Sequence, residues 1–142
     1  DYVVNLHKRN SDYLGFIPNP YLSKLVDNDQ VFMSFDGGLA SGFCVVGNGF
    51  SSTLKIYQHC IEEDLRKLNL GKKLFENVEQ FAENKGYNFI HLRCRHNLES
   101  NKFWQALNFS LLKTEKRQSK RTKIGINHWI YKLRNSKQHL LI

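Results

Sequence analysis

Apolar residues recur at helical spacing in the middle of the chain. One face of the stretch Leu70–Lys85 collects the apolar side chains Leu70, Leu74, Phe75, Val78, Phe81 and Ala82. Such a stripe is typical of an amphipathic helix packed on a core. Gly86 follows as a natural stop, because glycine readily adopts the left-handed backbone that ends a helix. Shorter helices are expected over Tyr21–Val26 and from Asn97, a suitable N-cap, to Leu107.

Runs of strand-forming residues surround these helices. Val31–Phe35 and Leu39–Val46 flank Asp36-Gly37-Gly38, a strong signal for a hairpin turn. Residues 1–10 fit either a strand or a helix. Hairpins at both ends and one strand–helix–strand unit between them predict a three-layer α/β domain and exclude a doubly wound sheet. The remaining strands are expected over Thr53–Ile61, Phe89–Cys94, Leu111–Arg117 and His128–Leu133.

Composition narrows the class of protein. With 142 residues, of which 41% are hydrophobic, residues 1–142 are expected to form a single domain with 136–142 as a flexible tail. The sequence has no apolar run long enough to cross a membrane and no visible export signal. Its three cysteines fit buried reduced thiols, so we expect a cytoplasmic protein without a membrane partner. The six histidines lack metal-ligand spacing, so no metal site is expected.

Positive charge is concentrated near the C-terminus. The formal net charge is +8 and the pI is about 9.5. The segment Lys113–Arg134 contains eight basic residues and one acidic residue, Glu115. Residues 116–123 read KRQSKRTK and are expected to connect two strands. Such a basic connection suits contact with nucleic acid; a solvated loop without a partner is the other interpretation.

Candidate chemistry lies where the third predicted strand meets the long helix. The segment Ile61–Leu74 reads IEEDLRKLNLGKKL, so a strand ends in a cationic loop that opens a helix. The unpaired N–H groups and the dipole of a helix N-terminus attract anions. Gly71 permits close approach of a phosphate to the backbone. The loop matches neither a Walker A nor a dinucleotide-binding pattern, and an ordinary basic helix start is the alternative.

This loop and a motif downstream of it resemble the GNAT superfamily of acetyl-CoA-dependent N-acetyltransferases. The family's pyrophosphate loop, [QR]-x-x-G-x-[GA], is similar to Arg66–Gly71, with Asn69 in place of the first glycine. Asparagine is among the non-glycine residues that best tolerate a positive φ. The family's second motif, roughly N-x-x-[AS]-x-x-F-Y-x-x-L-G-F, is similar to Asn97–Phe109, with Trp104 in place of the tyrosine.

The resemblance implies a three-layer sandwich with a mixed, mostly antiparallel sheet, helices on both faces, and acetyl-CoA as cosubstrate. The strand that ends at Ile61 would pair with the pantetheine amides, and a backbone N–H there would polarise the thioester carbonyl. The loop from Arg66 to Lys72 would hold the pyrophosphate. The cofactor-binding residues that the resemblance implies are Cys60, Ile61, Arg66, Lys67, Leu68, Asn69, Leu70, Gly71, Lys72, Asn97, Asn101 and Trp104.

The implied reaction is direct attack of a primary amine on the thioester, which needs a deprotonated amine and a proton for the thiolate. Trp104 stands where the family often has an acidic tyrosine, and indole cannot supply that proton. Alternation places Tyr57 and His59 on one face of their strand as the catalytic candidates. A purely structural His59, a water relay, or an acid from Tyr131 are the alternatives.

Two functions of a different class stay open on the same fold. One is a non-catalytic acyl-CoA sensor, in which Trp104 replaces the acid because no chemistry is needed. The other is a nucleic-acid-binding module that uses residues 116–123. The acceptor amine cannot be identified from the sequence, and a homodimer is a candidate assembly.

Overall fold

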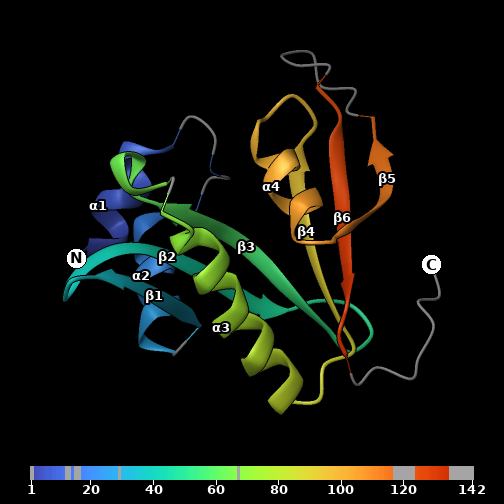
Figure 1. The fold of residues 1–142 in the computed structure, drawn as a ribbon, viewed down its shortest axis with the longest axis horizontal. Helices are drawn as coiled ribbons and strands as arrows, with labels where there is room; N and C mark the ends of the chain where they lie inside the picture. The colour runs from blue at the N-terminus through green and yellow to red at the C-terminus, as the bar shows by residue number, and fades with distance from the viewer. Residues whose placement is uncertain are drawn as a thin grey trace. The chain divides into compact units, whose positions relative to one another are not determined.

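The computed structural model describes residues 2–11, 14, 17–28, 30–66, 68–116 and 124–134 (Figure 1). Its helices are α1 (Tyr2–Arg9), α2 (Asn19–Asp27), α3 (Leu70–Asn84) and α4 (Ser100–Ala106), with a 3₁₀ turn over Glu63–Leu65. Its strands are β1 (Val31–Asp36), β2 (Leu39–Asn48), β3 (Thr53–Ile61), β4 (Phe89–Arg95), β5 (Ser110–Glu115) and β6 (Ile126–Lys132). No helix in this described part of the chain is both long and apolar enough to cross a membrane.

The six strands form one sheet in the order β1-β2-β3-β4-β6-β5. The pairs β1–β2, β4–β6 and β5–β6 are antiparallel, so the prediction of an α+β fold with a mostly antiparallel sheet is confirmed. The chain divides into two compact units. The first unit consists of Asp1–Gly47 and Ile56–Phe81, and the second of Asn48–Lys55 and Ala82–Ile142.

The hairpin at the start of the sheet has the predicted turn. Asp36 pairs with Leu39, so Gly37 and Gly38 alone form the loop between β1 and β2. Both glycines have a positive φ, 58° and 86°. A two-residue turn with this backbone matches the twist of the flanking strands, which is why the glycine pair was a reliable signal.

In the first unit, helices pack on both faces of the strands. Residues from α1 and α2 form one buried cluster with residues of β2 and β3, and this cluster consists of Val3, Leu6, Leu22, Leu25, Phe43, Val45 and Cys60. On the opposite face of β1, Phe32 contacts Phe81 of α3 edge to face, with 5.1 Å between the ring centroids. Residues 2–9, ambiguous in the sequence, are therefore helical because their apolar side chains belong to this cluster.

In the second unit, α3 and α4 are each followed by a residue with a left-handed backbone, and the one after α3 is the predicted glycine. Gly86 has a φ of 83° after α3, as expected for a helix stop. After α4, Asn108 has a φ of 71°, and the N–H of Phe109 donates to the carbonyl of Trp104 at 3.1 Å. This is a Schellman motif with asparagine in the place usually taken by glycine.

The predicted start of α4 was wrong. Asn97 does not cap the helix, which begins at Ser100 after Glu99, and no side chain caps its N-terminus. Asn97 instead lies in the turn after β4, where the N–H of Leu98 bonds to the carbonyl of Arg95 at 3.1 Å. The helix buries Trp104, whereas Phe103 and Leu107 are half-buried.

Candidate functional site

The two faces of β3 differ as alternation predicted. Gln58 and Cys60 are buried, whereas Tyr57 is 40% exposed and His59 is half-buried. The carbonyl oxygen of Ile61 marks the end of the strand, and the next N–H, from Glu62, bonds to the carbonyl of Ser41 at 2.8 Å. Tyr57 and His59 therefore share the more accessible face of the strand that leads into the cationic loop.

His59 is hydrogen-bonded to the beginning of α3. Its Nε2 lies 3.1 Å from the carbonyl oxygen of Gly71, and because a carbonyl only accepts, Nε2 carries the hydrogen. Burial lowers the pKa of His59 to about 4. The imidazole is therefore neutral at pH 7, with Nδ1 as its basic nitrogen, and it connects β3 to the helix start.

The loop between β3 and α3 has the backbone of an anion site. Asn69 has a φ of 60°, so asparagine adopts the left-handed conformation that the family's glycine would supply. Where α3 begins, the N–H of Lys73 donates to the carbonyl of Asn69 at 3.1 Å. The N–H groups of Leu70, Gly71 and Lys72 precede it, and three such groups at the positive end of a 15-residue helix attract anions.

The positive side chains of this loop have different roles. Lys72 and Lys73 are exposed at the start of α3. Arg66 instead donates from Nε to the carbonyl of Ile61 at 3.0 Å and from a terminal nitrogen to Asn10 Oδ1 at 2.9 Å. Arg66 therefore holds the loop against the end of β3. The predicted cofactor residue Lys67 lies outside the described residues.

Sequence reasoning missed the acid that fastens α1 to this loop. The Glu62 carboxylate accepts hydrogen bonds from Arg9, at 2.8 and 3.0 Å, and from the Tyr2 hydroxyl at 3.0 Å. The Arg9 guanidinium holds the pKa of Glu62 below its usual value. No local signal in the sequence distinguishes Glu62, because its partners lie more than fifty residues away.

In the second unit, Asn101 is the centre of an internal network. Its Nδ2 donates to the carbonyl oxygens of Arg95 and Leu98 at 2.9 and 2.8 Å. Its Oδ1 accepts from Asn127 Nδ2 at 3.0 Å and from Trp129 Nε1 at 2.8 Å. Asn101 therefore fastens α4 to β4 and β6 through its own side chain.

The other predicted residues of the second unit differ in accessibility. Asn97 is exposed. Trp104 is buried, and its ring packs edge to face on Phe103 and Phe109 with centroid distances of 4.8 and 5.2 Å. Buried aromatic packing of this kind explains a tryptophan at this position without any catalytic duty.

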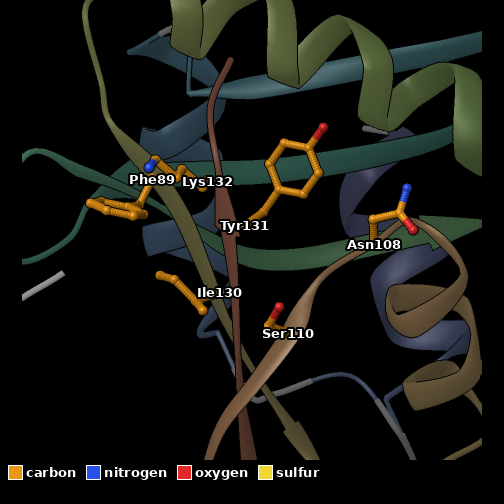
Figure 2. Close-up of a pocket in the computed structure, with 6 residues that line it drawn as sticks. All are labelled: Phe89, Asn108, Ser110, Ile130, Tyr131 and Lys132. Atoms are coloured by element: carbon orange, nitrogen blue, oxygen red, sulfur yellow. The ribbon is translucent and has the colours of Figure 1, made fainter. Parts of the chain in front are cut away.

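The second unit also has a cavity of about 360 Å³ (Figure 2). Tyr131 and Phe89, from β6 and β4, contribute to its wall, as shown in the close-up. Among the described residues, none of the loop from Ile61 to Lys72 lines it, and Tyr131 is the one lining residue that the sequence analysis names as a candidate acid. The described residues that line it are Phe89, Asn108, Ser110, Ile130, Tyr131 and Lys132.

The loop geometry and the sheet order both agree with a known family. A family model described as the acetyltransferase (GNAT) domain matches residues 21–133 of the chain. This protein belongs to the GNAT family. The family uses acetyl-CoA, and the chain is therefore a GNAT-type N-acetyltransferase. A search of curated proteins gave no match.

Solved structures share the GNAT fold at low sequence identity. Ard1 from Thermoplasma volcanium is 14% identical, with a TM-score of 0.76 over 90% of this chain and 87% of that one. The ribosomal-protein-S18-alanine N-acetyltransferase from Escherichia coli is 12% identical, with a TM-score of 0.64 over 84% and 81%. A protein described as a streptothricin acetyltransferase from Bacillus anthracis str. Ames, in complex with acetyl coenzyme A, is 18% identical, with a TM-score of 0.67 over 72% and 61%.

Stability should fall at acid pH because two histidines, His59 and His91, resist protonation in the folded protein. Burial lowers the pKa of His59 to about 4, and burial together with the charge of His128 lowers that of His91 to about 4. In an unfolded chain the pKa of histidine is about 6.5. Between about pH 6.5 and about pH 4 the unfolded state therefore binds more protons than the folded state. The free energy of unfolding is lost as the pH falls through this range. Urea midpoints measured across this range should fall, and less steeply in His91→Gln. Parallel pH profiles of the two proteins would contradict the assignment to His91.

Proposed function

We propose that this GNAT protein binds acetyl-CoA through the loop Arg66–Lys72 and transfers the acetyl group to a primary amine. The observation that carries the proposal is the left-handed Asn69, followed at once by the N–H groups at the start of α3. This backbone supplies several donors and the positive end of a helix to one anionic group. The pyrophosphate of coenzyme A is an anion of that kind.

The described residues fit this cosubstrate. The N–H groups of Leu70, Gly71 and Lys72 would hold the pyrophosphate, and the exposed ammonium groups of Lys72 and Lys73 would balance its charge. His59 and Arg66 keep the loop in place through the Gly71 and Ile61 carbonyls. Acetyl-CoA supplies an activated thioester. Ile61 would present its backbone beside it, as the family resemblance implies.

The acceptor is proposed to be an amine, because similar structures are named as N-acetyltransferases. The amine nitrogen forms a bond to the acetyl carbon, the carbon–sulfur bond breaks, and the amine proton has to leave. Nδ1 of His59 is the ring nitrogen that can accept a proton, since Nε2 donates to Gly71. Tyr57, 40% exposed on the same face, is the phenol proposed to give a proton to the thiolate.

The binding proposal is tested by titrating acetyl-CoA calorimetrically into the wild type, Lys72→Glu and Lys85→Glu. Lys72 is exposed in the first turn of α3, where an acid is favourable to the helix dipole, so Lys72→Glu should fold normally. The reversed charge faces the pyrophosphate, and we expect affinity to fall at least about tenfold. Lys85 is exposed beyond the other end of α3 and carries the same change of charge. Equal losses in both variants, or no binding to the wild type, would overturn the proposal.

The proposed role of Tyr57 has a separate test. Tyr57→Phe keeps the ring that packs against the backbone of Gly47 and removes only the hydroxyl. If the hydroxyl protonates the thiolate, kcat for an amine acceptor should fall by about 10²-fold or more with the Kd for acetyl-CoA unchanged. An unchanged kcat would assign the proton to another group.

The buried Trp104 favours one alternative, an acyl-CoA-binding protein without turnover. Its indole is packed between Phe103 and Phe109 and has no acidic proton to give. Release of free thiol from acetyl-CoA in the presence of a panel of primary amines separates the two functions. Tight binding with no thiol release from any amine would support the sensor. The predicted nucleic-acid contact through 116–123 lies outside the described residues, apart from Lys116.

A further inference from the structure

One face of the three strands β4, β6 and β5 is rich in positive charge. Arg93 and Lys113 both pair with His128, and side chains of directly paired residues lie on the same face of a sheet. Alternation along each strand extends this face, and Figure 1 shows the three strands side by side. The cationic face consists of Phe89, His91, Arg93, Arg95, Ser110, Lys113, Glu115, Ile126, His128, Ile130 and Lys132.

Glu115 is the only acid among the described residues of the cationic face, and it is already engaged. Its Oε2 lies 2.9 Å from His128 Nε2 and 3.5 Å from a guanidinium nitrogen of Arg93. A carboxylate accepts, so His128 Nε2 carries the hydrogen, and in the neutral imidazole Nδ1 accepts from His91 Nε2 at 3.0 Å. The described residues of this face therefore carry one carboxylate, Glu115, against the four cations Arg93, Arg95, Lys113 and Lys132.

The cations on this face and the neighbouring Lys55 of β3 act on one another. Burial, and then the charge of Arg93, lowers the pKa of Lys55. After burial and His128, the charges of Lys55, Arg93 and Lys113 lower the pKa of His91. Cations that repel one another across a surface create a positive potential, which attracts an anionic partner and speeds its association.

The distribution of apolar groups indicates which anion fits. Phe89 and Ile126 are buried, whereas Arg93, Lys113 and Lys132 are exposed. A partner would therefore meet charged groups, while protein interfaces have apolar centres depleted in charge. A phosphate backbone binds through cations without apolar burial, and a guanidinium matches phosphate geometry.

We propose that the cationic face binds the phosphate backbone of nucleic acid. The binding is sequence-independent, because the phenylalanine of this face is buried and offers no platform for base stacking. The four cations Arg93, Arg95, Lys113 and Lys132 carry it. This surface is built entirely from the second unit and does not depend on acetyl-CoA binding, so either proposal can fail without the other.

The test measures fluorescence anisotropy of a labelled single-stranded oligothymidine at increasing salt. Four phosphate contacts predict a slope of log affinity against log salt of about −3, or about a 50-fold loss for a fourfold rise in salt. The variant Arg93→Gln/Lys113→Gln/Lys132→Gln should reduce the magnitude of the slope by about 2. All three side chains are exposed, and the ion pair of Arg93 with Glu115 is a weak surface pair, so the variant should keep its fold.

The matched control is Lys8→Gln/Lys24→Gln/Lys102→Gln, which removes three exposed cations outside the cationic face. Its affinity and slope should stay close to those of the wild type. Equal losses in the two triple variants would overturn the proposal, because net charge would then explain the binding. Displacement of the oligonucleotide by polyglutamate at equal charge concentration would overturn it in favour of an acidic polypeptide.

Discussion

Replacing Asn101 by alanine should destabilise the protein by about 2–5 kcal/mol, because the change leaves buried polar groups without partners. Trp129 Nε1 and Asn127 Nδ2 would lose their shared acceptor, and both residues are almost completely buried. The carbonyls of Arg95 and Leu98 would lose a donor as well. We expect the thermal midpoint to fall by roughly 5–15 °C.

The chain offers a matched control for this change in Asn97→Ala. Asn97 has the same side chain but is exposed four residues earlier, so its loss should alter stability by no more than about 0.5 kcal/mol. The pair also tests the family-based expectation that both asparagines bind the cofactor. Normal stability with weakened acetyl-CoA binding in Asn101→Ala would contradict a structural role.

The second large effect is expected for Gly42→Val, where β2 lies close to the end of its neighbour β3. A Cβ at Gly42 would fall against the carbonyl oxygen of Cys60, and 3.0 Å from the Cα of Ile61. Both are backbone atoms, so the strands would have to separate, and we expect a loss of more than about 3 kcal/mol in the free energy of unfolding. Chemical unfolding of the variant measures this loss.

The control for Gly42→Val is Ala40→Val in the same strand. Ala40 is half-buried, and valine is favourable in strands, so the change should be nearly neutral. If Gly42→Val were as stable as this control, the close approach of β2 to the end of β3 would not be required. Since that approach positions Ile61, Gly42→Val is also expected to weaken acetyl-CoA binding.

Local patterns in the sequence were sufficient for most of the elements. The apolar stripe of α3, the glycine pair of the first hairpin and Gly86 each act within a few residues, so neighbouring side chains decide the outcome. The start of α4 was misplaced because Asn97 has a strong intrinsic preference for an N-cap. In the structure it lies in the turn after β4, whose hydrogen bonds prevail over that preference.

The two family motifs allow the backbone conformation of some residues to be predicted from the sequence, but not their distant contacts. Asparagine replaces glycine at both family positions, Asn69 and Asn108, and both adopt a positive φ of 60° and 71°. Asparagine tolerates this conformation better than most residues, so sequence alone could anticipate the left-handed backbone of Asn69. It could not show that Arg66 binds Asn10, because that contact depends on the packing of α1.

By itself the sequence determined the order of the elements from α2 onward, the amphipathic helix and the candidate anion loop, since each follows from residues close together in the chain. Tertiary structure alone decided that Glu62 accepts hydrogen bonds from Arg9 and that Asn101 accepts one from Trp129. It also decided that the cations of three strands lie on one face of the sheet. The physical reason is that strand register and helix packing bring together residues tens of positions apart. Their hydrogen bonds and charges then depend on burial and geometry that no local pattern contains.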